Sequence, residues 1–173
     1  MENGVKNVHG LDRLLSDFFS QDDLGRLAAD AGEILNCPLL VIDDTFHVVA
    51  HYTTPGFSDT LFEKAIQLGE ITYEAGTIIS RSPALSTGQS DFIDLADSTH
   101  RRRFAPLVSA GVRLGYLICI DVDQHLQEID AATSRTVETV LSKQLFVQVG
   151  RQDKPFETAE EILMHLLDGG FSS

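Results

Sequence analysis

The chain of 173 residues has no tryptophan, only two cysteines and half as many basic as acidic side chains. Thirteen Lys and Arg against 26 Asp and Glu give a formal net charge of −13, the wrong sign for a surface that neutralises nucleic-acid phosphates. Two cysteines are too few for a multi-bridge disulfide framework, so Cys37 and Cys119 are expected to be reduced and buried. If this protein contacts DNA, we therefore expect another segment to do so.

Long apolar runs are also missing. No stretch approaches the roughly 20 apolar residues that span a bilayer. The first 20 residues lack the basic start and apolar centre of a signal peptide. These absences predict a cytoplasmic protein with no membrane partner. A content of 43% hydrophobic and 23% charged residues is ordinary for a globular protein, and this length suits one domain with a real core.

The sequence contains none of the common catalytic motifs. It has no Gly-x-Ser-x-Gly elbow, no P-loop, no Gly-x-Gly-x-x-Gly and no His-Glu-x-x-His. His47 and His51 lie four residues apart on an expected strand, about 13 Å at roughly 3.3 Å per residue, which is too far for one metal ion. We therefore expect no enzyme, no catalytic residue, no metal and no cofactor.

The stretch from residue 100 to residue 150 organises the rest of the chain. Two apolar, β-branched runs, 102–109 and 112–121, flank Ala110-Gly111, which predicts a β-hairpin. The second run is apolar nearly throughout, so it is expected to be a central strand covered on both faces. Apolar residues then recur at helical spacing over 126–148, a helix about 35 Å long at roughly 1.5 Å per residue.

Apolar residues at the end of that helix predict a homodimer. They point in several directions and need a second surface. A short amphipathic helix over 11–19 must also dock, on its own subunit or on the partner. The expected two-fold interface of packed helices contains Leu15, Phe18, Phe19, Leu145, Phe146 and Val149.

Caps and periodicity predict the remaining elements. Residues 1–10 are expected to be frayed, Arg101–Arg103 to be a solvated strand start, and Thr158–Glu161 to be the capping box of a helix that stops at Gly169-Gly170. We expect helices over 24–35, 61–68 and 71–80, strands over 39–42, 46–52 and 92–95, and a loop over 81–89.

This order implies an α+β fold: an antiparallel sheet of five to six strands with helices on both faces and a long C-terminal helix. Five segments also carry a family resemblance: LNCPLLVID at 35–43, FHVVA at 46–50, FAPLV at 104–108, GYL at 115–117 and EILMHLLDG at 161–169. They resemble a GAF/PAS-like domain, and more closely the N-terminal sensory region of PucR-like (purine-catabolism and sugar-diacid type) bacterial transcriptional regulators.

The resemblance implies three parts. An N-terminal helical segment (1–21) precedes a GAF-like sensory domain (22–150). A connecting segment with a helix (151–173) leads towards a C-terminal effector module, absent here, which would be the only part to contact DNA.

The implied function is a small-molecule-sensing, dimerising regulatory domain. Its effector would bind between the sheet and the 57–80 helices, and the 126–148 helix would relay the signal. Arginines suit a carboxylate or a purine carbonyl, and tyrosines offer a flat surface with one polar tip. The candidate ligand contacts are Tyr52, Tyr73, Arg81, Arg103 and Tyr116.

Two other functions stay open. The domain could be a ligand-free oligomerisation scaffold whose pocket is filled by its own side chains. A small GAF-type thiol redox enzyme using Cys37 and Cys119 is the third hypothesis.

Overall fold

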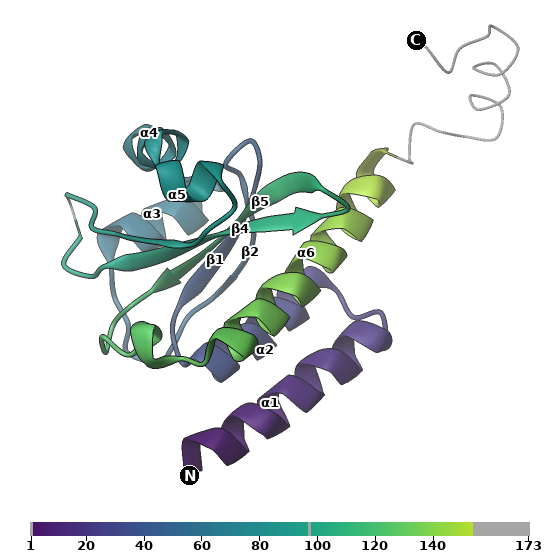
Figure 1. The fold of residues 1–173 in the computed structure, drawn as a ribbon. Coiled ribbons are helices and arrows are strands. Elements are labelled where there is room, and N and C mark those ends of the chain that lie inside the picture. The colour runs from purple at the N-terminus through teal and green to yellow at the C-terminus, as the bar shows by residue number, and fades with distance from the viewer. Residues whose placement is uncertain (1, 97, 154–173) are drawn as a thin grey trace, which may run out of the picture.

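The computed structural model describes residues 2–96 and 98–153 and confirms the α+β fold (Figure 1). Five strands form one antiparallel sheet in the order β2-β1-β5-β4-β3. The strand expected to be central, β5, lies in the middle of the sheet and is buried from Leu114 to Ile120. The strands are β1 (Leu39–Asp43), β2 (Val48–Tyr52), β3 (Asp91–Ile93), β4 (Arg102–Ser109) and β5 (Val112–Ile120).

Helices cover both faces of the sheet. On one face α2 packs on β2 and α6 packs on β4, while α1 lies against both helices. On the other face α3, α4 and α5 form a separate cover, which we call the α3–α5 cover. The helices are α1 (Glu2–Phe19), α2 (Leu24–Leu35), α3 (Thr60–Leu68), α4 (Tyr73–Arg81), α5 (Pro83–Ser86) and α6 (Ala131–Asp153).

Strand alternation divides the core in two. Successive side chains of a strand point to opposite faces, so Leu117 and Cys119 of β5 pack towards α2 and α6, whereas Ile118 and Ile120 pack under the α3–α5 cover. The two apolar clusters are therefore separated by the sheet itself. A change under the cover can reach the long helix only through the strands or around their ends.

The β4–β5 hairpin is confirmed. Its two turn residues, Ala110 (φ 53°) and Gly111 (φ 76°), are both left-handed, as the tightest hairpin turns require. Pro106 lies opposite Tyr116, and β3 pairs only with Arg102–Phe104. Among the described residues, the half of β4 that contains Pro106 therefore has no second partner strand, which accommodates a residue without an N–H.

The start of the long helix differs from the prediction. A separate 3₁₀ turn, η1 (Leu126–Glu128), precedes α6, which begins only at Ala131. The Leu126 amide donates to Asp121 Oδ1 (3.2 Å), and Ile129 is extended (ψ 134°), so the chain turns before the helix begins. Leu126 and Ile129 still pack against the core, which explains why they matched the helical stripe.

Two further predictions were wrong. Residues 2–10 are helical as part of α1, not frayed. The expected loop over 81–89 contains α5, because Ser82 Oγ accepts from the Leu85 amide (3.2 Å) and Pro83 stands at the first helical position.

The helix predicted after Thr158 lies outside the described residues. No helix in the described part of the chain combines the length and apolar character needed to cross a membrane.

A carboxyl pair joins α1 to α2 and predicts a pH dependence. Asp30 is 3% exposed, and Arg26 Nε lies 3.3 Å from Asp17 Oδ2 and 3.9 Å from Asp30 Oδ1. Burial, followed by the adjacent Asp17 carboxyl, raises the pKa of Asp30 to about 7 from 3.8. The hydrogen bond with Asp30 lowers the pKa of Asp17, whose titration therefore falls at more acid pH.

The folded state holds the Asp30 proton more tightly than the unfolded chain does. The free energy of unfolding should therefore fall as pH rises from about 4 to about 7. Urea unfolding between pH 5 and 8 measures this. The Asp30→Asn variant should lose this part of the pH dependence and be more stable than wild type at pH 8. Parallel profiles for the two proteins would contradict the assignment.

Candidate ligand-binding site

A small cavity lies between the sheet and the α3–α5 cover. It measures about 30 Å³, room for one or two water molecules, whereas ligand pockets measure roughly 300–1,000 Å³. Its walls are almost wholly apolar and come from β1, β4, β5, α3 and α4, with Phe104 and Ile118 on the sheet side. Arg102 is the one charged residue among the described residues that line it.

An open groove adjoins the cavity. It measures about 460 Å³ and lies between the β1–β2 turn and residues 70–81. Ile71 and Thr72 line both the groove and the cavity, so these two residues form the wall between them. Thr72 is also the N-cap of α4, because its Oγ1 accepts from the Ala75 amide (3.2 Å). The start of α4 therefore lies between the small, mostly apolar cavity and the larger groove.

Phe46 shapes the groove at the β1–β2 turn. Its φ of 69° is uncommon for a bulky residue and is held by two hydrogen bonds, from the Phe46 amide to Asp43 O (3.1 Å) and from the Ile71 amide to Phe46 O (3.1 Å). The ring lies over Gly76 of α4, where a Cβ would stand 3.0 Å from it. Because Gly76 has no side chain, α4 can pack closely against the Phe46 ring, and both residues line the groove.

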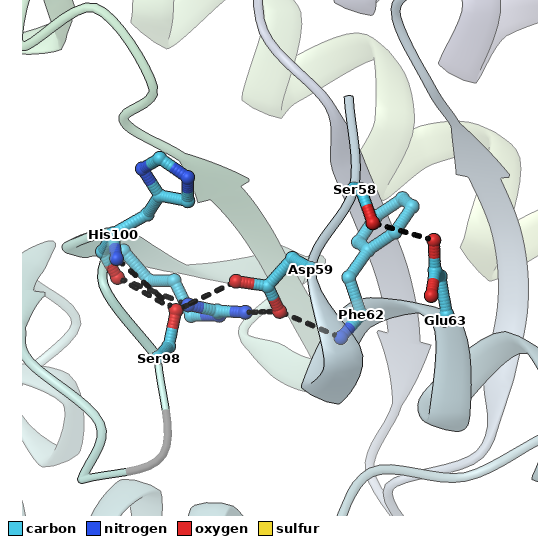
Figure 2. A network of polar contacts seen from close by, with 7 residues as sticks. Ser58, Asp59, Phe62, Glu63, Ser98 and His100 are labelled. Carbon is cyan, nitrogen blue, oxygen red and sulfur yellow. Dashed lines mark hydrogen bonds and ion pairs between the residues drawn. The ribbon is translucent and has the colours of Figure 1, made fainter. Parts of the chain in front are cut away.

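Arg102 anchors the cover to the sheet through a buried network (Figure 2). Its Nη2 donates to Asp59 Oδ1 (2.7 Å), and its Nη1 donates to Ser98 Oγ (2.6 Å) and to His100 O (3.0 Å). Asp59 is the N-cap of α3, since Oδ1 also accepts from the Phe62 amide (2.9 Å). Ser98 Oγ donates to Asp59 Oδ2 (2.7 Å).

The network keeps the Asp59 carboxyl ionised. Burial alone would raise its pKa, but the hydrogen bonds from Ser98 and Phe62 and the charge of Arg102 together hold the pKa of Asp59 below its usual range. Burial lowers the pKa of Arg102, against the opposing effect of Asp59. Arg102 and Asp59 thus form a buried ion pair. Arg102 belongs to the sheet, and Asp59 is the residue immediately before α3 of the cover.

The five predicted ligand contacts do not form one site. Tyr73 and Arg81 both line the groove. Tyr116 is buried beneath the cover, with its ring centroid 6.4 Å from that of Phe46. The other two belong to the opposite face: Tyr52 packs on Gly32 of α2, and Arg103 pairs with Glu138 of α6 (3.0 Å).

Arg102 was missed, and the expectation of a solvated Arg101–Arg103 was wrong for two of its three members. Only Arg101 is well exposed. The signal that could have found Arg102 is strand alternation: if 102–109 is a strand, the middle arginine faces away from its two neighbours. A charge between apolar strand residues then has to be buried with a partner.

The predicted interface residues divide into buried and exposed groups. Leu145 is 1% exposed and belongs to the core of its own subunit, and Leu15, Phe18 and Val149 are partly buried against the same core. Phe19 and Phe146 are exposed at 76% and 46%. The homodimer stays a prediction, now supported by a smaller set of exposed apolar side chains.

Both cysteines are buried free thiols. A hydrogen bond with Cys119, together with burial, raises the pKa of Cys37, which disfavours the nucleophilic thiolate. The redox hypothesis stays a prediction, and loss of a measurable thiol activity in Cys119→Ser would support it.

The structure is similar to a known fold. It matches the crystal structure of the GAF domain from Acinetobacter phosphoenolpyruvate-protein phosphotransferase with a TM-score of 0.50 and 10% sequence identity, over 83% of this chain and 94% of that chain. No protein-family model and no curated protein matches the chain. At this identity the likeness shows the fold alone: the chain has a GAF-like fold.

Proposed function

We propose that this chain is a small-molecule-sensing regulatory domain whose ligand binds between the sheet and the α3–α5 cover. One observation carries the proposal: the small cavity beside Arg102 shares two lining residues, Ile71 and Thr72, with a groove of about 460 Å³. A shift at the start of α4 would merge the two into a pocket of ordinary ligand size. Tyr73 and Arg81 would then stand at its outer end.

A route to α6 passes through β4. Arg102 and Arg103 are consecutive and point to opposite faces, so one contacts Asp59 under the cover and the other contacts Glu138 of α6. A ligand that changed the contacts of Arg102 would bias the Arg103–Glu138 contact. The second route runs from β5 through Asp121, which holds the Leu126 amide before α6. A signal requires only that the ligand bind one arrangement of these contacts more tightly than the other.

The finer assignment is to a PucR-like bacterial transcriptional regulator. Its support is the resemblance of the five segments and the GAF-like fold. In this proposal the domain works in the cytoplasm as a homodimer, and DNA is contacted only by an effector module beyond this chain.

Two variants of the wall residues test the ligand site. Ile71→Ala opens the wall between the groove and the cavity, and Ala75→Leu fills the cavity, which Ala75 lines. In a thermal-shift screen with small metabolites, a compound that stabilises the wild type should lose its effect in Ala75→Leu and keep it in Ile71→Ala. A compound that acts equally on all three proteins binds elsewhere.

The scaffold function is the alternative, and the small size of the cavity favours it. A cavity of about 30 Å³ is largely filled by its own side chains. In that case no metabolite stabilises the wild type or Ile71→Ala, while the protein is still a dimer.

The dimer itself is testable at Phe146. Introducing a charge on this exposed side chain of α6 should separate the subunits without unfolding them, so Phe146→Glu should be a monomer by light scattering at tens of micromolar. The matched control is Leu68→Glu, which changes another exposed apolar residue, on the α3–α5 cover, and should stay dimeric. A wild type of 19.0 kDa in solution would contradict the prediction.

A further inference from the structure

The Arg102–Asp59 pair is the point where the cover is tied to the sheet. Arg102 belongs to β4, and Asp59, which Figure 2 labels, stands immediately before α3, 43 residues away in the chain. The two side chains are 4% and 3% exposed. Any movement that lifts the start of α3 from the sheet must pull the Asp59 carboxylate away from the guanidinium.

Separation of the pair has a consequence for the kind of ligand that can enter. The guanidinium would stay among apolar cavity residues without a counter-ion, which is strongly unfavourable. A neutral molecule that opened the cover would leave that charge uncompensated. A molecule carrying its own carboxylate would replace the Asp59 carboxylate and restore the ion pair.

The geometry of the network suits such an exchange. Arg102 donates three hydrogen bonds to described residues, out of the five N–H groups of a guanidinium. Ser98 Oγ already donates to a carboxylate oxygen of Asp59 and could donate to an incoming one. Asp59 would keep its contact with the Phe62 amide after release, so α3 would stay capped.

We propose that Arg102 is a carboxylate-recognition residue and that Asp59 occupies its site as an internal carboxylate when the pocket is closed. The ligand class is a small molecule with one carboxylate and an apolar body, because Arg102 is the one charge among apolar walls such as Leu40, Phe104 and Ile118. This inference rests on the proposed ligand site and names its chemistry.

Asp59→Asn tests the exchange directly. Asparagine is as good an N-cap as aspartate and can still pair with Ser98, but it removes the charge that neutralises Arg102. Calorimetric titrations with benzoate and with its neutral analogue benzamide compare the wild type, Asp59→Asn and Asp59→Asn/Arg102→Met. Asp59→Asn should bind benzoate at least tenfold tighter than the wild type does and at least tenfold tighter than it binds benzamide.

The double variant separates the role of Arg102 from that of the cavity. It should bind benzoate no better than benzamide, because the cationic partner is gone. Equal affinity of Asp59→Asn for the two probes, or no binding of either, would overturn the proposal. If Asp59→Asn does not fold, the same two probes are titrated into Ile71→Ala, which enlarges the cavity and keeps the ion pair. A tenfold preference of this variant for benzoate over benzamide supports the proposal. Equal affinity for the two probes, or no binding of either, overturns it.

The same titrations distinguish this inference from the proposed function. Suppose that Ile71→Ala binds benzamide as tightly as benzoate and that Ala75→Leu binds neither probe. The ligand site is then supported, and its selectivity for a carboxylate is wrong. If neither probe binds and no metabolite stabilises the wild type, the ligand site itself is wrong.

Discussion

Replacing Arg102 with methionine should lower the free energy of unfolding by about 3 to 5 kcal/mol, the usual cost of removing one partner of a buried ion pair. The reason is Asp59, which is 3% exposed at its side chain and would be left as an uncompensated charge beside an apolar cavity. Urea unfolding of wild type and Arg102→Met at pH 7, followed by far-ultraviolet circular dichroism, measures the difference.

Arg101→Met is the matched control. Arg101 pairs with Asp94 at 3.3 Å, but the two side chains are 47% and 71% exposed, and such pairs contribute about 0 to 1 kcal/mol. The double variant Asp59→Asn/Arg102→Met removes both charges and keeps an N-cap, so it should be more stable than Arg102→Met alone. A loss below about 1 kcal/mol in Arg102→Met would mean that the pair is solvated and does not hold the cover.

Gly115→Ala should also destabilise strongly, by about 3 kcal/mol, at the upper end of the cost of an overpacked core. Gly115 of β5 lies opposite Asp43 of β1, and a Cβ there would overlap the carbonyl oxygen of Ile42 and stand 2.9 Å from the Asp43 Cα. These neighbours are backbone atoms of a paired central strand, so they cannot rotate away. Urea unfolding is again the measurement.

Gly25→Ala is the control for the same chemical change. Gly25 is exposed in the first turn of α2, and the nearest atom to its Cβ position is Asp23 Oδ1 at 3.4 Å. Alanine there should stabilise by about 0.5 kcal/mol, because it restricts the unfolded chain and favours the helix. Equal effects at the two positions would show that β1 and β5 do not approach as closely as the structure indicates.

Much of the fold could be predicted because its signals are local. The apolar run from Leu114 to Ile120 identified the central strand, and the turn at Ala110-Gly111 joined it to β4. The caps at Asp23, Asp59 and Gly69 each act on backbone groups within one turn of a helix, so residue type and position narrow such caps to one or two neighbouring residues.

The candidate site was harder, because its key pair is not local. Arg102 and Asp59 are 43 residues apart, and no short pattern links an arginine within a charge run to a helix cap on the other layer. Tyr73 and Arg81 both line the groove because they lie at the two ends of α4, although the sequence placed Arg81 in a loop. Tyr52 and Arg103 lie on the opposite face of the sheet, because successive strand residues point to opposite faces and residue type alone does not indicate which face a side chain joins.

The start of α6 shows a related limit. Leu126 and Ile129 fit the helical stripe because they reach the same core, although the chain between them turns at η1. Periodicity reports which side chains are buried, and an irregular connection can bury the same ones. The Asp121 contact with the Leu126 amide and the extended backbone of Ile129 distinguish the two arrangements, and neither changes which side chains are buried.

Native mass spectrometry of the chain, purified from cells without denaturation, tests the central claim most directly. The account predicts a bound small molecule as added mass on the wild type, carrying a carboxylate and absent from Ala75→Leu, whose cavity is filled. Wild-type protein that shows only the mass of the bare chain or its dimer, and that no metabolite stabilises, would contradict a ligand-sensing role and leave the scaffold function.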